Sequence, residues 1–154
     1  MKMFSNEDFV RESNRIEGIL RDPKPEEMAE FQRFIDLETV TVEDIQHFVS
    51  IYQPRFPVGV LRSSPDIPGV RVGNHIAPPS GPDIRARLDH LVRCANAGTM
   101  SAWEVHTAYE YLHPFTDGNG RSGRMLWRWQ MKQAPIGFLH QFYYQTLAKL
   151  SEAK

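Results

Sequence analysis

The chain has 154 residues, a length that suits one domain with a substantial buried core. Its 18 basic and 19 acidic residues give a formal net charge of −1 without any block of like charge, which argues against nucleic-acid binding. The single cysteine, Cys94, excludes an internal disulfide framework, and no apolar run resembles a membrane span or a signal peptide, so we expect a cytoplasmic protein that does not bind membranes.

The first predicted element is a helix over residues 5–20, because its apolar residues fall near one helical stripe. Asp22 and Pro23 would end it. Within this stretch, Ser13 is followed four residues later by Glu17 and then by Gly18. By pattern alone, an amphipathic helix with Glu17 in water is the preferred interpretation.

Helices are also predicted over residues 26–37 and from Thr41 to Tyr52, the second with a capping sequence at its start. From residue 53 to residue 82 the pattern changes, because seven of the eleven prolines lie here and helical periodicity disappears. We interpret residues 53–82 as a surface loop that carries a short β-hairpin. The hairpin would comprise Val70, Arg71, Val72, Gly73, Asn74, His75 and Ile76. The alternative is an inert connector.

Residues 83–97 predict a further helix that ends at Gly98, and Ser101 begins another that delivers His113. A helix over residues 120–133 and a last helix over residues 136–150 complete a mainly α fold. The aromatic residues of the last helix would lie in the core, although some could line an adenine pocket.

The twelve residues from His113 to Arg124, HPFTDGNGRSGR, carry the chemistry. Gly118, Asn119 and Gly120 allow a tight turn that feeds a helix N-terminus, and such a turn binds anions through free N–H groups and the helix dipole. Arg121 and Arg124 lie three residues apart on one helix face, where both can bind phosphate oxygens.

Two further side chains extend this phosphate site toward catalysis. Asp117 offers hard carboxylate oxygens that suit a Mg²⁺ ion bridging phosphates. His113 is the one side chain of this segment that can accept a proton near neutral pH. The segment therefore predicts a nucleotide site with its own base.

These residues resemble the signature of the Fic (filamentation induced by cAMP) family, His-x-Phe-x-(Asp/Glu)-Gly-Asn-Gly-Arg-x-x-Arg, and match it at every specified position from His113 to Arg124. The resemblance implies a single Fic-type helical domain over residues 1–154, with a helix–anion loop–helix core at 99–133. It also implies an adenylyltransferase that moves AMP from ATP to a Ser, Thr or Tyr hydroxyl of a target protein, or of itself, with Mg²⁺ as cofactor. His113 would be the base, Asp117 the metal ligand, and Gly118, Asn119, Gly120, Arg121 and Arg124 the nucleotide-binding residues.

The same resemblance gives roles to two other segments. Ser13-x-x-x-Glu17-Gly18 is similar to the family's inhibitory motif, (Ser/Thr)-x-x-x-Glu-(Gly/Asn), whose glutamate pairs with the second arginine of the signature, here Arg124. Residues 5–20 would then be an inhibitory helix on the same chain. Residues 70–76 would correspond to the hairpin flap that holds the target segment, since an exposed strand edge can pair with an extended peptide.

Two alternatives remain open. The chain could remove AMP from a modified target, with Glu17 as a catalytic residue. It could also be a nucleotide-binding interaction module without turnover, although the presence of His113, Asp117 and both arginines argues against this. The sequence indicates no particular oligomeric state.

Overall fold

The computed structural model describes residues 5–55 and 58–132. Within them the fold is mainly α, with one two-stranded antiparallel hairpin, as predicted. The helices are α1 (Asn6–Ile16), α2 (Pro25–Ile35), α3 (Val42–Tyr52), α4 (Pro82–Ala97), α5 (Ala102–Leu112) and α6 (Asn119–Met131), and the strands are β1 (Arg71–Val72) and β2 (His75–Ile76). The helix predicted over residues 136–150 lies outside the described residues.

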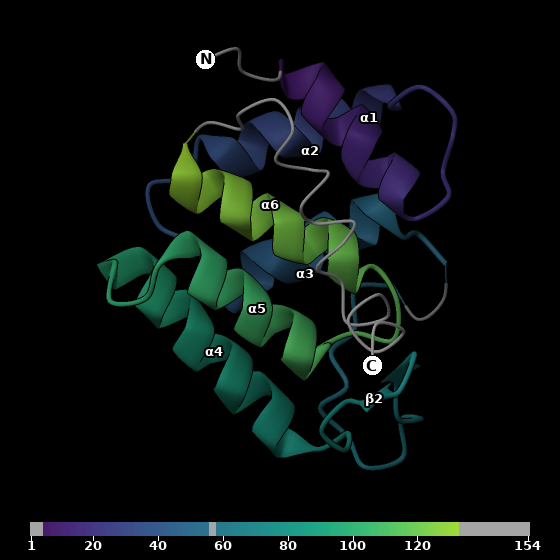
Figure 1. Cartoon of the computed structure of the whole chain (residues 1–154), viewed down its shortest axis with the longest axis vertical. Coiled ribbons are helices and arrows are strands. Elements are labelled where there is room, and N and C mark those ends of the chain that lie inside the picture. Colours follow the sequence, from purple (N-terminus) through teal and green to yellow (C-terminus); the bar gives the residue numbers. More distant parts are fainter. Residues whose placement is uncertain (1–4, 56–57, 133–154) are drawn as a thin grey trace.

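Helix α6 is the centre of the bundle (Figure 1). Helices α1, α2, α3 and α5 all pack against it, and α4 covers the outer side of α5. Consequently α6 is buried along most of its length, including Trp127, which is 1% exposed. Helix α6, which begins at the predicted anion loop (Gly118 to Gly120), is therefore also the centre of the core.

The helix boundaries follow local capping chemistry. The hydroxyl groups of Thr41 and Ser101 each accept a hydrogen bond from the backbone N–H group three residues later, in Asp44 and Glu104. The carboxylates of Asp44 and Glu104 in turn accept from the backbone N–H groups of Thr41 and Ser101, which completes two capping boxes. Helix α4 ends at Gly98, whose φ of 69° lies in the left-handed region that glycine adopts most readily. The sequence predicts these two helix starts and this helix end, and the observed boundaries agree with the predicted ones.

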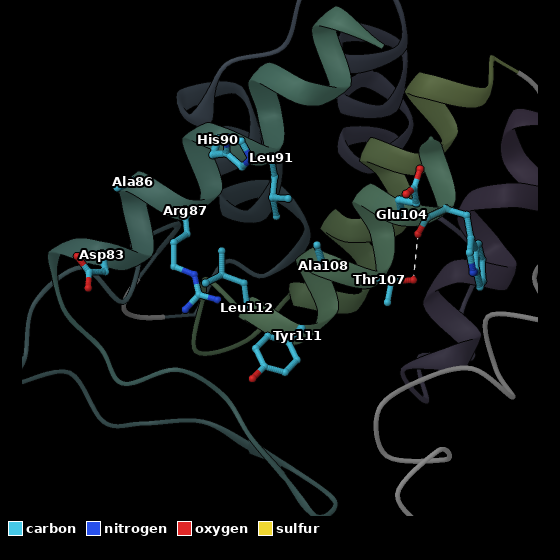
Figure 2. A pocket seen from close by; sticks show the side chains of 11 residues that line it. Asp83, Ala86, Arg87, His90, Leu91, Glu104, Thr107, Ala108, Tyr111 and Leu112 are labelled. Atoms are coloured by element: carbon cyan, nitrogen blue, oxygen red, sulfur yellow. Dashed lines mark hydrogen bonds between the residues drawn. The ribbon is translucent and has the colours of Figure 1, made fainter. Parts of the chain in front are cut away.

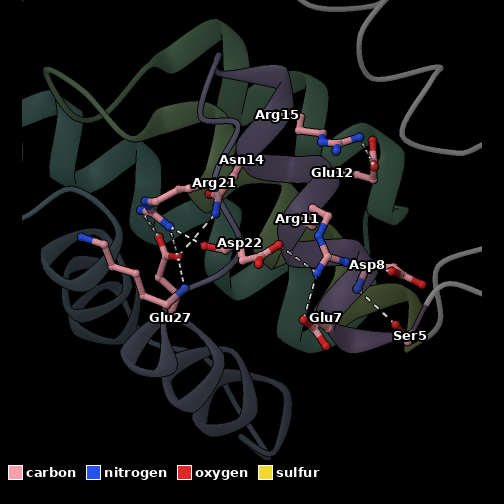
Figure 3. Close-up of polar contacts among 11 residues, drawn as sticks. Ser5, Glu7, Asp8, Arg11, Glu12, Asn14, Arg15, Arg21, Asp22 and Glu27 are labelled. Atoms are coloured by element: carbon pink, nitrogen blue, oxygen red, sulfur yellow. Dashed lines mark hydrogen bonds and ion pairs between the residues drawn. The ribbon is translucent and has the colours of Figure 1, made fainter.

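Helix α1 is docked by aromatic packing and by a polar cluster. Phe9 stacks on Trp127 of α6 with ring centroids 6.4 Å apart, and it also contacts Phe31 of α2. Figure 3 shows Asn14 and Arg21 converging on Glu27 at the start of α2, where Arg21 Nη1 donates to Glu27 Oε1 at 2.8 Å. Because Glu27 is 1% exposed, this contact fixes the segment that follows α1 against the bundle.

The hairpin lies at the end of the bundle where α4 begins and α5 ends (Figure 1). Arg71 pairs with Ile76 and Val72 with His75, so Gly73 and Asn74 form the turn. His75 Nε2 lies 2.9 Å from the carbonyl oxygen of Tyr111, and the two rings are in contact. This histidine joins the hairpin to α5 two residues before His113.

None of the helices within residues 5–55 and 58–132 has the length and apolar character needed to cross a membrane.

Candidate active site

The turn between α5 and α6 is held in shape by its own side chains. Asn119 Oδ1 accepts a hydrogen bond from Phe115 N–H at 2.9 Å, and Asn119 Nδ2 donates to Phe115 O at 2.8 Å. Phe115 itself is 1% exposed, so its ring anchors the loop in the core. The side chain of Asn119 is thus committed to the turn, which leaves its backbone N–H group for a ligand.

The turn opens directly into the N-terminus of α6. Gly118 is the N-cap residue and has a φ of 84°, a conformation that strains any residue with a Cβ. The N–H groups at the start of α6 lack partners within the helix and form the positive end of its dipole. A helix N-terminus of this kind can bind an anion, and the predicted nucleotide-binding residues lie at it.

His113 caps the C-terminus of α5 in a left-handed conformation, with a φ of 48°. Its Nδ1 atom lies 2.5 Å from the carbonyl oxygen of Glu110. A carbonyl can only accept, so Nδ1 carries the proton and Nε2 presents its lone pair. Burial lowers the pKa of the His113 imidazole below its ordinary value, so the ring stays neutral and able to accept a proton at near-neutral pH.

The carboxylate of Asp117 is oriented by two donors. Gln53 Nε2 donates to Asp117 Oδ2 at 2.8 Å, and the Gly118 N–H group donates to Asp117 Oδ1 at 2.7 Å. A carboxylate has about four lone-pair sites, so these contacts leave room for a cation. A polar cavity of 220 Å³ adjoins Asp117 and is lined by Gln53, Arg55 and Thr116 among others.

No cluster of three or more His, Cys, Asp or Glu side chains in the described part of the chain could hold a metal ion. Asp117 would therefore supply a single carboxylate. This is compatible with Mg²⁺, which is commonly bound by one or two carboxylates together with substrate phosphates and water. The donor set fits a metal that arrives with a nucleotide.

Arg124 is 1% exposed and contacts two residues of the N-terminal motif. Its Nε atom donates to Ser13 Oγ at 2.8 Å, and its Nη2 atom donates to Ser13 O at 2.9 Å and to Glu17 Oε1 at 2.8 Å. The Glu17 carboxylate also lies directly against the anion loop, since a Cβ on Gly120 would overlap Glu17 Oε1. An acidic side chain thus lies beside the turn that the sequence predicts to bind anions.

Gly18 has a structural reason to follow Glu17. Its N–H group donates to Arg15 O and the N–H group of Ile19 donates to Asn14 O, while Gly18 adopts a φ of 79°. This is the Schellman ending of a helix, in which glycine or asparagine is preferred. Helix α1 therefore stops at Ile16, four residues earlier than predicted, and Glu17 projects from its end toward Arg124.

Arg121 is also buried, but it is bound differently from Arg124. Its Nη1 atom donates to the carbonyl oxygen of Tyr52, the last residue of α3, at 2.6 Å. Its Nε atom has no hydrogen-bond partner within the described residues. The two signature arginines thus have different partners in this structure: Arg121 binds a backbone carbonyl, whereas Arg124 binds a carboxylate.

Glu110 adds a second acidic group near Arg124. Burial raises the pKa of Glu110 to about 7, with Arg124 acting against the rise and Glu17 adding to it. The side chain lies against α6, because a Cβ on Gly123 would be 3.1 Å from Glu110 Oε1. Sequence reasoning missed this residue, which has the pattern of an ordinary helix position.

A wide apolar groove of 860 Å³ runs between α4 and α5, away from the anion loop. Figure 2 shows Arg87 and Leu91 of α4 facing Ala108 and Leu112 of α5 across it, with Tyr111 at one end. No residue of the signature from His113 to Arg124 lines it. The groove is therefore separate from the predicted nucleotide site.

Two supporting residues, Gln53 and Arg62, were not identified from the sequence. Gln53 ends α3 and holds Asp117, while Arg62 lies in the proline-rich loop and is completely buried. Neither belongs to a motif, and their partners are 64 and 51 residues away in the chain. Only the tertiary fold brings them to the site.

Comparison with known protein families identifies the family of this chain. The family model described as the Fic/DOC family matches residues 32–131, a range that includes the whole signature and the hairpin and begins after α1. No significant match was found among curated proteins or among solved structures. With about two thirds of its length matched by this model, the chain belongs to the Fic/DOC family.

Proposed function

We propose that this protein is an adenylyltransferase that moves AMP from ATP to a Ser, Thr or Tyr hydroxyl of a target protein, and that the Glu17–Arg124 contact restrains it. Fic/DOC proteins generally bind ATP and transfer nucleoside monophosphates to proteins. One observation carries the proposal: the oriented imidazole of His113 and the N-terminus of α6, where an anion would bind, lie at the two ends of one short loop.

In the proposed reaction, the target hydroxyl oxygen attacks the α-phosphorus of ATP while His113 Nε2 accepts the hydroxyl proton. A new P–O bond to the target forms, the bond between the α-phosphorus and its bridging oxygen breaks, and pyrophosphate leaves. A positioned base of this kind contributes about 10²–10⁴-fold to the rate. Because Nδ1 already donates to Glu110 O, the ring is held in the tautomer that the step requires.

The loop and the arginines would stabilise the developing charge. N–H groups around Gly118, Asn119 and Gly120 face the anion site, and each well-placed donor is worth about 3–4 kcal/mol in a comparable oxyanion site. Arg121 would reach phosphate oxygens by exchanging its contact with Tyr52 O. Asp117 would hold Mg²⁺, which neutralises phosphate charge when bound.

The restraint follows from where Glu17 lies. Its carboxylate occupies one side of the Arg124 guanidinium and contacts the loop at Gly120. The γ-phosphate of ATP would compete for the same guanidinium and be repelled by the carboxylate. ATP held by the rest of the loop would then have its α-phosphorus out of line with the attacking hydroxyl, and misalignment of this kind lowers the rate more than the affinity.

The test uses ATP labelled either at the α- or at the γ-phosphorus. The Glu17→Ala protein with Mg²⁺ should retain the α label on itself or on a target and lose the γ label, and adding His113→Ala should abolish incorporation while ATP binding persists. Retention of the γ label would instead indicate phosphate transfer. Unchanged incorporation in the His113→Ala protein would remove His113 from the mechanism.

A further inference from the structure

Arg62 has an unusual environment for an arginine. It is 0% exposed, and burial lowers the pKa of its guanidinium, with no carboxylate among the described residues to offset the effect. A buried cation of this kind is costly unless its donors are all well placed. The partners of the guanidinium therefore indicate why the residue is tolerated there.

Its first two partners are at the end of α5. Arg62 Nε donates to His113 O at 2.7 Å, and Arg62 Nη2 donates to Leu112 O at 2.9 Å. The last carbonyls of a helix lack partners within it and lie at the negative end of the helix dipole, so a cation is favourable at this position. Arg62 thus caps α5 from another segment and holds the residue proposed as the base.

Its other two partners follow the hairpin. Arg62 Nη1 donates to Pro78 O at 2.9 Å and to Ser80 Oγ at 3.0 Å. The backbone of Arg62 continues the connection, since its N–H group donates to Pro114 O and its carbonyl accepts from Gly81 N–H, both at 2.9 Å. One side chain therefore joins the segment that leaves β2 to the turn that carries His113.

We propose, on the basis of the AMP transfer proposed above, that Arg62 is a positioning residue for that reaction: it fixes the backbone at His113 and sets the distance between this base and the hairpin. The left-handed φ of 48° at His113 supports this role, because a non-glycine residue keeps such a conformation only when its surroundings hold it. Arg62 contacts no signature residue that we assign to phosphate or metal.

The charge of Arg62 has a second effect on the base. Burial is the main cause of the lowered pKa of His113, and the hydrogen bond to Glu110 O acts against it. Among the described residues, the charged or titratable groups that act on the ring are His75 of the hairpin and Arg62, which both lower its pKa, and Glu17 at the end of α1, which raises it. Removing the Arg62 charge should therefore raise the pKa of His113 and move the acidic limb of the rate profile to higher pH.

Two substitutions separate geometry from charge, and both are made in the active Glu17→Ala protein. Arg62→Lys keeps the charge but cannot reach four oxygens, so the maximal transfer rate should fall about 10- to 100-fold, as expected for a base displaced by about 1 Å. The dissociation constant for ATP should change little and the acidic limb should stay in place. Arg62→Gln should lower the rate further and also shift the limb upward.

The matched control is Arg128→Lys. Arg128 is also buried, and its guanidinium lies over the ring of Phe31, a residue of α2. This control should lower the melting temperature without changing the rate at saturating substrate or the position of the limb. Equal losses of rate, ATP affinity and stability in the Arg62 and Arg128 variants would show that Arg62 is merely structural and overturn the proposal.

A measurement without turnover keeps the inference separate from the proposed function. The pKa of the His113 imidazole can be followed by NMR, with its resonance assigned by its loss in His113→Ala. It should rise in Arg62→Gln and stay near the starting value in Arg62→Lys. An unchanged pKa in Arg62→Gln would overturn the coupling of Arg62 to His113, whereas absence of AMP transfer in Glu17→Ala itself would count against the proposed function.

Discussion

Helix α1 and the hairpin both contact the region of the signature loop, and they do so by different means. The end of α1 uses specific side chains, Ser13 and Glu17, on one buried guanidinium, and Phe9 anchors the helix in the core. The hairpin has two-residue strands and is tied to α5 through His75 and a backbone carbonyl. Regulation would therefore reside in a few identifiable side chains, whereas target binding would reside in a strand edge that accepts many sequences.

The largest expected contrast is in stability. Phe9→Ala removes a ring that is 3% exposed between α2 and α6, and such truncations cost about 3–5 kcal/mol. Ile76→Ala in the hairpin should stay within about 0.5 kcal/mol, because Ile76 is 72% exposed. Denaturant unfolding of both proteins measures the difference. Similar losses for the two variants would contradict the view that α1 is part of the core and the hairpin is not.

The next effect concerns the side chains at the end of α1. Glu17→Ala should raise AMP transfer about 5- to 150-fold, the range of a coupling free energy of about 1–3 kcal/mol, and should raise ATP affinity much less. Glu12→Ala is the matched control, since Glu12 pairs with Arg15 on the exposed side of the same helix (Figure 3). It should leave transfer unchanged.

If Glu17→Ala modifies nothing faster than the wild type but fails to remove AMP from a modified target, the assignment changes. Glu17 would then be a catalytic residue of the reverse reaction. Release of AMP from a pre-modified target, followed with and without Glu17, decides between the two directions.

The smallest effect concerns the strand edge. Antiparallel pairing alternates, and the bond from Ala77 N–H to Val70 O places Ile76 at a position whose own N–H group points away from β1. Ile76→Pro removes that outward donor, and loss of one backbone hydrogen bond worth about 0.5–1.5 kcal/mol should slow transfer to a protein target about 2- to 12-fold.

Ile76→Ala serves as the control here, because it keeps the N–H group and removes only the side chain. ATP binding should be the same in both variants. A loss of ATP binding that matches the loss of transfer would mean that the hairpin supports the fold of the nucleotide site and does not hold the target.

The structure places the contiguous part of the candidate site, from His113 to Arg124, where the sequence predicts it, on the turn between α5 and α6 and the first turns of α6. The turn from His113 to Arg124 could be interpreted directly because its glycines, arginines and acid act through local geometry. Capping pairs predicted helix starts for the same reason. The end of α1 was misplaced because the apolar stripe continues through Ile19 and Leu20, whereas the left-handed conformation of Gly18 stops the helix.

The parts that were not predicted depend on distant partners. Gln53 orients Asp117 and Arg62 holds His113, although the two partners lie 64 and 51 residues apart in the sequence. No local sequence pattern indicates contacts over such separations. The burial of a polar residue is equally hard to predict from the sequence. Glu110 occupies an ordinary helix position in the sequence pattern, and its pKa is raised only because the fold buries it. The roles of the signature residues from His113 to Arg124, of Glu17 and of residues 70–76 remain predictions, as does the assignment of residues 1–154 to one domain.

The Schellman ending of α1 has a consequence for how the enzyme would be switched on. Phe9 holds the first half of the helix, while Ser13 and Glu17 lie in its final turn. A carboxylate at a helix C-terminus also opposes the helix dipole, so this turn is less stable than the rest once Arg124 is withdrawn. If Glu17 restrains the reaction as proposed, activation would require only fraying of about one turn, with α1 still docked. Amide hydrogen exchange should be faster around residues 15–19 than around residues 8–11, and ATP should widen that difference.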